Sequence, residues 1–306
     1  HACFRKDGDP MGWIEGLNAS VDYIEEHLDG DVDIARAASF ASCTEGQFRR
    51  IFSYLAGMGL AEYVRKRRLS CAALDLSRGE RVLDVAVRYG YSSPTAFNRA
   101  FQEVLGMSPS EARCPGAPLL VFPRCTFALT VTGAEPLPWR VVTQQGMRLV
   151  GISASCGTAR GNPLVQMSSS GRESLSNLWK RASQDGVIER LVALADGSGP
   201  QGILGVNVCK DDDGQSYQIA VASSREAPVW ADEMHVPSGL WAVFDCMGPC
   251  DTATAECYRR IYSEWLPSSG YKLSGDVSIE VYPQGDFSST SYRSEIWMPI
   301  SKRFSA

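Results

Sequence analysis

The chain has 306 residues, of which 44% are hydrophobic, so it is long enough for two domains with cores of their own. Its net charge is −5, but residues 34–113 carry 12 Arg or Lys against 7 Asp or Glu, whereas residues 114–306 carry 16 against 19. No run reaches the roughly 18 apolar residues of a membrane-spanning helix, so we expect no membrane partner. The basic excess in the first part favours nucleic-acid binding there.

Residues 1–10, "HACFRKDGDP", have no apolar core and do not look like a signal peptide. We interpret them as an extension or tag remnant before Met11 and predict a cytoplasmic location. The ten cysteines include no CxxC pair, and the spacing of Cys246, Cys250 and Cys257 is not that of a standard zinc site. We therefore expect neither a metal nor a cofactor.

Residues 81–101 predict two helices with a tight turn between them. Gly90 suits the left-handed position that ends the helix "RVLDVAVRY". Ser93 can cap the next helix, and Pro94 fits its first turn, where a missing N–H has no cost. This arrangement is a helix-turn-helix, although a plain helical hairpin would have the same signals.

A second copy of this pattern lies upstream in "AASFASCTEGQFRRIF", residues 37–52. Thr44 and Gln47 form a capping box where the other copy has Ser-Pro. Residues 60–79 between the copies predict one long helix. Its cluster Arg65–Arg68 is either a solvated basic face or a set of phosphate contacts. The matched positions are Ala38 with Ala86, Phe48 with Phe97, Arg50 with Arg99 and Phe52 with Phe101.

Residues 11–113 resemble the DNA-binding domain of the AraC/XylS family. The resemblance is carried by "FRRIFSYLAGMGLAEYVRKRRLSCAALDL" and "VAVRYGYSSPTAFNRAFQEVLGMSPSEAR". It implies an all-α domain of two helix-turn-helix units that enter successive major-groove segments of promoter DNA. RNA polymerase is a further candidate partner. Helical spacing leaves these candidates for DNA contact: Gln47, Arg49, Arg50, Thr95, Asn98 and Arg99.

Residues 114–137 read as a linker, "CPGAPL", and a leading strand, after which short apolar runs alternate with two helical segments. The order predicts an α+β domain over residues 138–306, built as two β-α-β-β halves. A Gly/Ser-rich loop is expected at residues 154–171. The predicted strands are 119–133, 139–145, 147–155, 203–209, 216–224, 240–246, 277–283 and 294–300, and the predicted helices are 172–186 and 251–267.

Residues 138–304 resemble the GyrI-like effector-binding domain through "LWKRASQDGVIERL", "GILGVNV", "VPSGLWAVFDCMGP" and "VSIEVYP". The resemblance implies a cleft between the halves that binds small molecules, often lipophilic cations, with a glutamate at Glu280. Strand alternation puts Ser278, Glu280 and Tyr282 on one face. Glu280 then either faces water or meets a cation among aromatic rings. The candidate effector contacts are Glu280, Tyr282, Trp179, Tyr217, Trp241 and Trp297.

Together these patterns predict a sequence-specific transcription regulator that senses a small, amphipathic cationic effector and has no catalytic residues. Some GyrI-like domains resemble hydrolases, so Glu280 with Tyr282 or Tyr217 could instead serve as acid and base. A second alternative is a binding module that sequesters a partner protein or a toxic compound.

Overall fold

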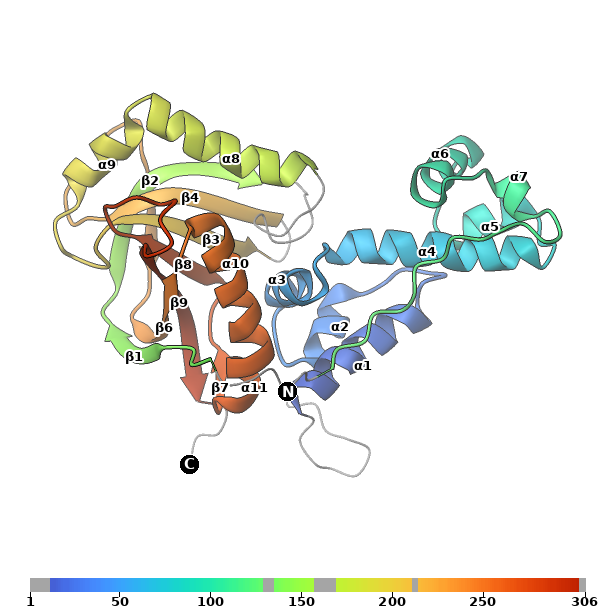
Figure 1. Ribbon diagram of the computed structural model, residues 1–306, viewed down its shortest axis with the longest axis horizontal. Coiled ribbons are helices and arrows are strands. Elements are labelled where there is room, and N and C mark those ends of the chain that lie inside the picture. Colours follow the sequence, from blue (N-terminus) through green and yellow to red (C-terminus); the bar gives the residue numbers. More distant parts are fainter. Residues whose placement is uncertain (1–11, 129–134, 157–168, 211–213, 303–306) are drawn as a thin grey trace. The chain divides into compact units, whose positions relative to one another are not determined.

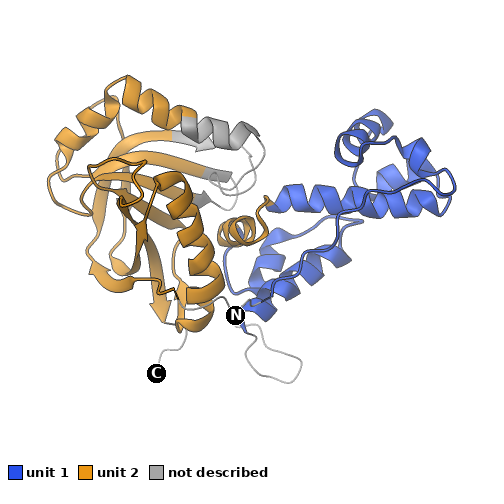
Figure 2. Cartoon of the chain, in the orientation of Figure 1, with its two compact units in different colours: residues 1–45, 60–128 blue, residues 46–59, 129–306 orange. Residues whose placement is uncertain are grey.

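A computed structural model of the chain describes residues 12–128, 135–156, 169–210 and 214–302. The chain forms two compact units (Figure 2). Unit 1 comprises residues 1–45 and 60–128, and unit 2 comprises residues 46–59 and 129–306. Unit 2 thus includes a short piece of chain from the first helix-turn-helix copy.

The described part of unit 1 is helical. The caps expected for the second helix-turn-helix are present: Gly90 has a φ of +83°, and Ser93 Oγ accepts from the backbone N–H of Ala96 at 3.1 Å. These contacts confirm the turn and the start of the second helix. The helices are α1 (Trp13–Glu26), α2 (Ile34–Phe40), α4 (Leu60–Ser77), α5 (Val82–Arg88), α6 (Pro94–Leu105) and α7 (Pro109–Ala112).

The long helix α4 supplies one side of a core that α5 and α6 complete. Leu69 and Ala73 of α4 are fully buried with Val85 of α5. Phe97 and Phe101 of α6 are also fully buried, and their rings meet edge to face at 5.4 Å between centroids. These two phenylalanines therefore face inward, as the helical spacing predicts.

The basic cluster Arg65–Arg68 is engaged within unit 1. Arg67 forms a two-pronged ion pair with Glu25, at 2.7 Å between Nη2 and Oε2. Burial raises the pKa of Glu25, but hydrogen bonds from Arg67 and Tyr63 outweigh it and the net shift is downward. The other pairings are Arg65 with Glu103, Lys66 with Glu62 and Arg68 with the carbonyl of Leu28. The cluster holds helices of unit 1 together. This role differs from both expectations, a solvated basic face and a set of phosphate contacts.

Residues 119–128 were expected to begin a strand, and the structure corrects this. Among the residues that the structure describes, their backbone pairs with no strand; it hydrogen-bonds side chains of α1 and α4 instead. The N–H of Phe122 donates to Ser70 Oγ at 2.8 Å, and Asn18 bonds both the N–H and the C=O of Phe127 at 2.8 Å. Side chains on the helices satisfy the backbone groups that a neighbouring strand would otherwise have to satisfy. Residues 129–133 of the expected strand lie outside the described residues.

The described part of unit 2 holds a single antiparallel sheet with helices (Figure 1). The strand order is β1-β6-β9-β8-β3-β4-β2-β5, and β7 pairs with β9. The strands are β1 (Trp139–Gln144), β2 (Met147–Cys156), β3 (Ile203–Lys210), β4 (Gly214–Ala222), β5 (Asp232–Val236), β6 (Gly239–Met247), β7 (Tyr271–Leu273), β8 (Val277–Tyr282) and β9 (Arg293–Lys302). The helices are α3 (Glu45–Ala56), in unit 2 from Gly46 on, α8 (Ser169–Gln184), α9 (Val187–Leu194) and α10 (Cys250–Arg260), which continues as η1 (Ile261–Trp265) and α11 (Leu266–Ser268).

The sheet confirms the α+β architecture of two β-α-β-β halves. One half runs β2, α8 and α9, β3, β4; the other runs β6, α10, β8, β9. Strands β3 and β8 pair antiparallel where the halves meet. The strand that precedes each half pairs with the other half, because β1 joins β6 and β5 joins β2. Most of the expected loop, residues 157–168, lies outside the described residues.

The two faces of the sheet have different partners. Ile279 and Val281 of β8 belong to an apolar cluster on one face, with Leu204 and Val206 of β3. On the other face, Tyr217 and Ile219 of β4 pack in a cluster with Leu178, Ala182 and Leu191 of α8 and α9, and Phe244 of β6 meets Trp265 edge to face at 4.9 Å. The helices that follow β2 and β6 therefore cover the same side of the sheet (Figure 1).

We predict that Glu25→Gln destabilises the chain at pH 7 by about 1–3 kcal/mol, because Arg67 loses a charged partner. The folded pKa of Glu25 is lowered, so its stabilisation is present above the unfolded pKa of about 4.3 and is lost as pH falls through the folded value. Urea unfolding followed by circular dichroism should show the difference at pH 7 and a smaller one below pH 4.

Glu62→Gln is the matched control, because Glu62 pairs with Lys66 on the half-exposed surface of α4. It should change the stability by less than about 0.5 kcal/mol. An equal loss in both variants would contradict a special role for Glu25.

Candidate functional site

Glu280 lies at the centre of β8 with its side chain fully buried. Its Oε1 accepts from Asn207 Nδ2 at 3.0 Å, and its Oε2 accepts from the hydroxyl of Tyr282 at 2.9 Å and that of Tyr217 at 3.3 Å. We call these four residues, with Tyr258 and Trp179 described below, the Glu280 site. They come from both halves of unit 2, so the β3–β8 pairing assembles the site.

Glycine at position 205 makes the approach of these groups possible. Gly205 is the register partner of Glu280 in the β3–β8 ladder. A Cβ at this position would lie 2.2 Å from the hydroxyl of Tyr217 and 2.9 Å from Glu280 Oε2. Any side chain here would therefore push the tyrosine or the carboxylate away, and the absence of one lets Tyr217 reach across β3 to Glu280.

The surroundings of Glu280 determine its charge state. Burial raises its pKa, and hydrogen bonds from Tyr282, Asn207, Tyr258 and Tyr217 only partly oppose this. In the part of the chain that the structure describes, these donors are all neutral. The carboxyl group therefore keeps its proton to a higher pH than an exposed glutamate, and a cation placed beside it would favour the ionised form.

Aromatic side chains surround the same carboxylate. The indole N–H of Trp179 donates to the hydroxyl of Tyr217 at 3.1 Å, and the Trp179 ring meets Tyr282 nearly at right angles, at 5.6 Å between centroids. The structure thus brings together four of the residues proposed from sequence: Glu280, Tyr282, Tyr217 and Trp179.

Trp241 and Trp297 are not part of this arrangement. Trp297 is the register partner of Ile279, so its side chain points to the face opposite Glu280. The ring centroid of Trp241 lies 6.3 Å from that of Trp297, and both side chains belong to the apolar cluster on that face. The sequence shows alternation within each strand but not which strands pair, and the pairing decides the face that each ring shares.

Three polar residues of this region were not proposed from sequence: Asn207, Tyr258 and Ser278. Asn207 is a buried amide in the apolar run "ILGVNVC", which is a signal that sequence reading could have used. The hydroxyl of Tyr258, on α10, lies 3.2 Å from Ser278 Oγ. The position of Tyr258 in the sequence gives no indication that its side chain on α10 meets Ser278 on β8.

The proposed DNA contacts of the second helix-turn-helix are accessible. Thr95, Asn98 and Arg99 are exposed on α6, opposite the buried Phe97 and Phe101. They form one polar face of a helix in the place expected for a recognition helix. Their exposure is compatible with contact to base edges.

The corresponding residues of the first helix-turn-helix have another environment. Gln47 and Arg50 are only 3% and 2% exposed. Gln47 Nε2 donates to the carbonyl of Gly275 at 3.0 Å, and Arg50 Nη1 donates to Ser278 Oγ at 2.8 Å. Arg49 is half-buried. The expectation that Gln47 and Arg50 face outward is therefore corrected for this structure: both are buried within unit 2 and hydrogen-bond Gly275 and Ser278.

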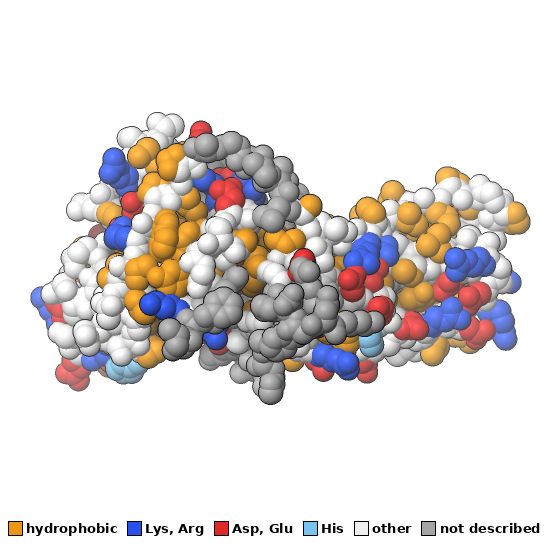
Figure 3. Space-filling view, turned by 90° about the horizontal axis from the view of Figure 1, so that it is seen from below, with side chains coloured by type: hydrophobic (Ala, Val, Ile, Leu, Met, Phe, Trp, Pro, Cys, Tyr) orange, Lys and Arg blue, Asp and Glu red, His pale blue; other side chains and the backbone are white. Residues whose placement is uncertain are grey.

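Charges on the surface of unit 1 are mixed in sign. In Figure 3 most basic clusters over this unit lie next to acidic ones. Ion pairs such as Arg88 with Glu80, at 2.6 Å, and Arg78 with Asp75, at 3.2 Å, account for part of this pattern. The net basic charge of residues 34–113 thus forms no continuous basic surface on the face that Figure 3 shows.

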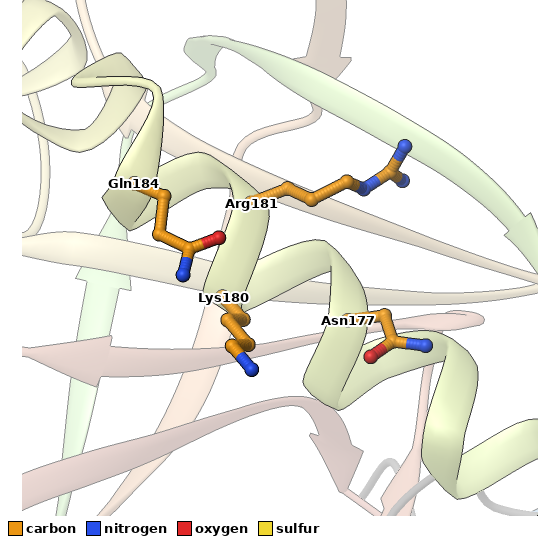
Figure 4. Close-up of a pocket in the computed structure, with 4 residues that line it drawn as sticks. All are labelled: Asn177, Lys180, Arg181 and Gln184. Carbon is orange, nitrogen blue, oxygen red and sulfur yellow. The ribbon is translucent and has the colours of Figure 1, made fainter.

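A surface hollow on α8 has a different character from the Glu280 site (Figure 4). The described residues that line it are Asn177, Lys180, Arg181 and Gln184, which share one side of the helix. Its amides and positive charges are unsuited to a lipophilic cation. Trp179, one residue from Lys180, points to the sheet instead, since it bonds Tyr217.

Neither a metal centre nor a membrane span is found among the residues that the structure describes. Their His, Cys, Asp and Glu side chains do not gather in threes where an ion could bind. Of the helices within 12–128, 135–156, 169–210 and 214–302, none combines the length and apolarity that a bilayer crossing needs.

Comparison with known proteins places both parts of the chain. A model described as "Helix-turn-helix domain" matches residues 37–114, and one described as "GyrI-like small molecule binding domain" matches residues 138–301. The regulatory protein SoxS of Salmonella typhimurium is 33% identical over 98 residues, which are 32% of this chain and 92% of SoxS. YbfP of Bacillus subtilis, an uncharacterized HTH-type transcriptional regulator, is 32% identical over 104 residues, about a third of each protein.

These matches define the chain as a helix-turn-helix DNA-binding protein with a small-molecule binding domain. It belongs to the AraC-type transcription regulators, a family of regulators rather than enzymes, and its second part is a GyrI-like domain. The alternative of a GyrI-like hydrolase is thereby set aside.

Solved structures resemble each part separately. The structure of SAV2435 bound to tetraphenylphosphonium covers 54% of this chain and 94% of that protein, at 24% identity and a TM-score of 0.46. The DNA-binding domain of AdpA in complex with a target DNA covers 32% of this chain and 89% of that domain, at 30% identity and a TM-score of 0.30.

We predict that Glu280→Gln stabilises the ligand-free chain at pH 8 by roughly 1 kcal/mol or more, because it removes a buried charge. The folded pKa of Glu280 is raised, so the stability it contributes is present below the unfolded pKa of about 4.3 and is lost as pH rises through the folded value. Thermal unfolding from pH 4 to pH 8 should show the gain growing with pH.

Glu295→Gln serves as the control on β9, because Glu295 accepts from Arg140 at the surface. This variant should show no gain at high pH. A pH-independent difference between Glu280→Gln and the parent chain would contradict the raised pKa.

Proposed function

We propose that this chain is a sequence-specific promoter-binding regulator whose activity responds to an amphipathic organic cation at the Glu280 site. One observation supports this most: a fully buried carboxylate whose direct donors are the neutral groups of Asn207, Tyr217 and Tyr282. A buried charge of this kind is costly unless an opposite charge joins it.

An organic cation suits this site better than a metal ion or a neutral ligand. The rings of Trp179, Tyr217 and Tyr282 offer faces and edges near the carboxylate, and each ring can attract a cation by roughly 0.5–2 kcal/mol. A lipophilic cation would also bury apolar surface against the same rings. A small inorganic cation would instead require several oxygen ligands. Among the described residues of the site, Glu280 supplies a single carboxylate.

The DNA-binding part of the proposal depends on exposed residues of α6. Arg99 can form a two-pronged contact with guanine, while Asn98 and Thr95 can reach neighbouring base edges or phosphates. Gln47, Arg49 and Arg50 of α3 would read the adjacent groove segment once their side chains are free to do so.

We predict that tetraphenylphosphonium binds the full chain and that Glu280→Gln weakens binding at least about tenfold, through loss of the charge partner. Binding should also weaken as pH falls, because the proton and the cation compete for the carboxylate. The pKa of Glu280 is raised, so this loss should begin at a higher pH than it would for an exposed glutamate. Isothermal titration calorimetry at several pH values measures both effects.

Glu295→Gln is again the control and should leave the affinity within about twofold of the parent value. Binding of the cation that persists unchanged in Glu280→Gln would show that the ligand occupies another place. The proposal would then be wrong.

We predict that Arg99→Ala costs about 1–3 kcal/mol of discrimination at the bound promoter sequence. The promoter fragment is first recovered from genomic DNA by footprinting with the purified chain, and affinities are then measured by fluorescence anisotropy. Arg81→Ala removes the same charge from an exposed position beside Asp84. It should weaken binding slightly, and by the same factor for every DNA sequence. Unchanged affinity and sequence preference in Arg99→Ala would contradict the role of α6.

A further inference from the structure

One face of α3 packs against β8, the residues before it and α10, within unit 2. Gln47, Arg50 and Tyr54 are spaced so that they lie on the same side of this helix. Besides the hydrogen bonds of Gln47 and Arg50 to β8 and the residues before it, Tyr54 stacks on Tyr258 with the ring centroids 4.5 Å apart. The ring of Tyr262 lies 5.6 Å from that of Tyr54. The contacts of this face therefore include two hydrogen bonds and aromatic packing.

This docked face leads directly to Glu280. Ser278, which accepts from Arg50, precedes Glu280 by two residues and points to the same side of β8. The hydroxyl of Tyr258 lies 3.2 Å from Ser278 Oγ and is one of the groups that oppose the rise in the pKa of Glu280. Burial raises the pKa of Tyr54, and the nearby Tyr258 and Glu280 raise it further. The guanidinium of Arg50 is therefore a buried cation on the hydrogen-bond network of the carboxylate.

The Glu280 site is closed in this arrangement. Glu280 and Tyr258 are fully buried, and Tyr217 is 1% exposed. A ligand that contacts the carboxylate must therefore displace groups that now surround it. Helix α8 packs on the sheet through the apolar Leu178 and Ala182 and a hydrogen bond from Trp179, and the contacts of α3 include two hydrogen bonds and a stacked ring pair.

The apolar side of α3 is distinct from the side that carries Gln47 and Arg50. Phe48 and Phe52 are fully buried and lie on a different side of the helix from Gln47 and Arg50. Their rings are 6.1 Å apart. The face that enters unit 2 is the polar one, which the helix-turn-helix pattern directs toward DNA.

Building on the proposed function, we propose that an effector cation and helix α3 are alternative occupants of the Glu280 site. The cation takes the place of the Arg50 guanidinium beside Ser278, two residues from Glu280 on the same strand face, and α3 is released. Gln47 and Arg50 cannot bond to unit 2 and to DNA at once, so release makes the first recognition helix available. The effector and DNA then favour the same undocked state, and each strengthens the binding of the other.

Hydrogen–deuterium exchange of the unmodified full chain tests this without any substitution in α3. Saturating tetraphenylphosphonium should increase the exchange of backbone amides in residues 46–56, because the helix loses its docked face. The same addition to Glu280→Gln should change nothing there. Unchanged or slower exchange in residues 46–56 of the unmodified chain, with the cation bound, would overturn the inference.

A substitution gives an independent readout. Arg50→Ala removes the competing cation, so tetraphenylphosphonium should bind at least about fivefold more tightly. Arg49→Ala, the neighbouring arginine of the same helix, is the matched control and should stay within twofold of the parent chain. Equal affinities for Arg50→Ala and the parent chain would overturn the competition.

The two proposals fail in different ways. If tetraphenylphosphonium does not bind the parent chain at all, the cation-sensing function is wrong and the competition falls with it. If it binds and depends on Glu280, but neither α3 exchange nor Arg50→Ala affinity responds, then the sensing function stands and only the competition is wrong.

Discussion

The antiparallel pairing of β3 with β8 is the contact on which the rest of unit 2 depends. It joins the two halves of the domain, and it sets Gly205 opposite Glu280 so that no side chain separates the carboxylate from the hydroxyl of Tyr217. Asn207 reaches Glu280 from the same strand. A shift of this register by one residue would send Glu280 into the apolar cluster and its neighbours Ile279 and Val281 toward the helices. The buried charge, its donors and the surrounding rings all follow from one ladder of backbone hydrogen bonds.

Sequence patterns were sufficient wherever local chemistry determines the structure. Ser93, Pro94 and Gly90 mark a helix boundary by rules that need no tertiary information, and the alternation in "VSIEVY" identifies the face of Glu280. The double helix-turn-helix and the two β-α-β-β halves were also predicted, through family resemblance as much as through periodicity. Tyr282 was found because it shares the strand face of Glu280, Trp179 lies in a motif of the resembling family, and Tyr217 was one of the aromatic residues proposed for the cleft.

Long-range pairing was what the sequence did not reveal. Trp241 and Trp297 look equivalent to Trp179 until the strand register places them across the sheet. The apolar residues 119–128 have a strand composition, yet Ser70 and Asn18 bond their backbone on the helices of unit 1. Gln47 and Arg50 have the spacing of DNA contacts. No local signal shows that they donate hydrogen bonds to Gly275 and Ser278. In each case the deciding partner lies on another element of the chain, beyond the reach of local sequence patterns.

The exchange of edge strands between the halves has a consequence for how the protein is made. Strand β1 has no partner until β6 emerges, about a hundred residues later, and β6 in turn pairs with β9 near the end of the described chain. Loop closure over such distances is slow, and synthesis proceeds from the N-terminus. A ribosome-bound chain therefore carries the helices of unit 1 well before the sheet can close, and neither half of unit 2 can complete its sheet alone. A chain that stops before β9 lacks the strand that joins β6 to β8, so the sheet stays in two pieces.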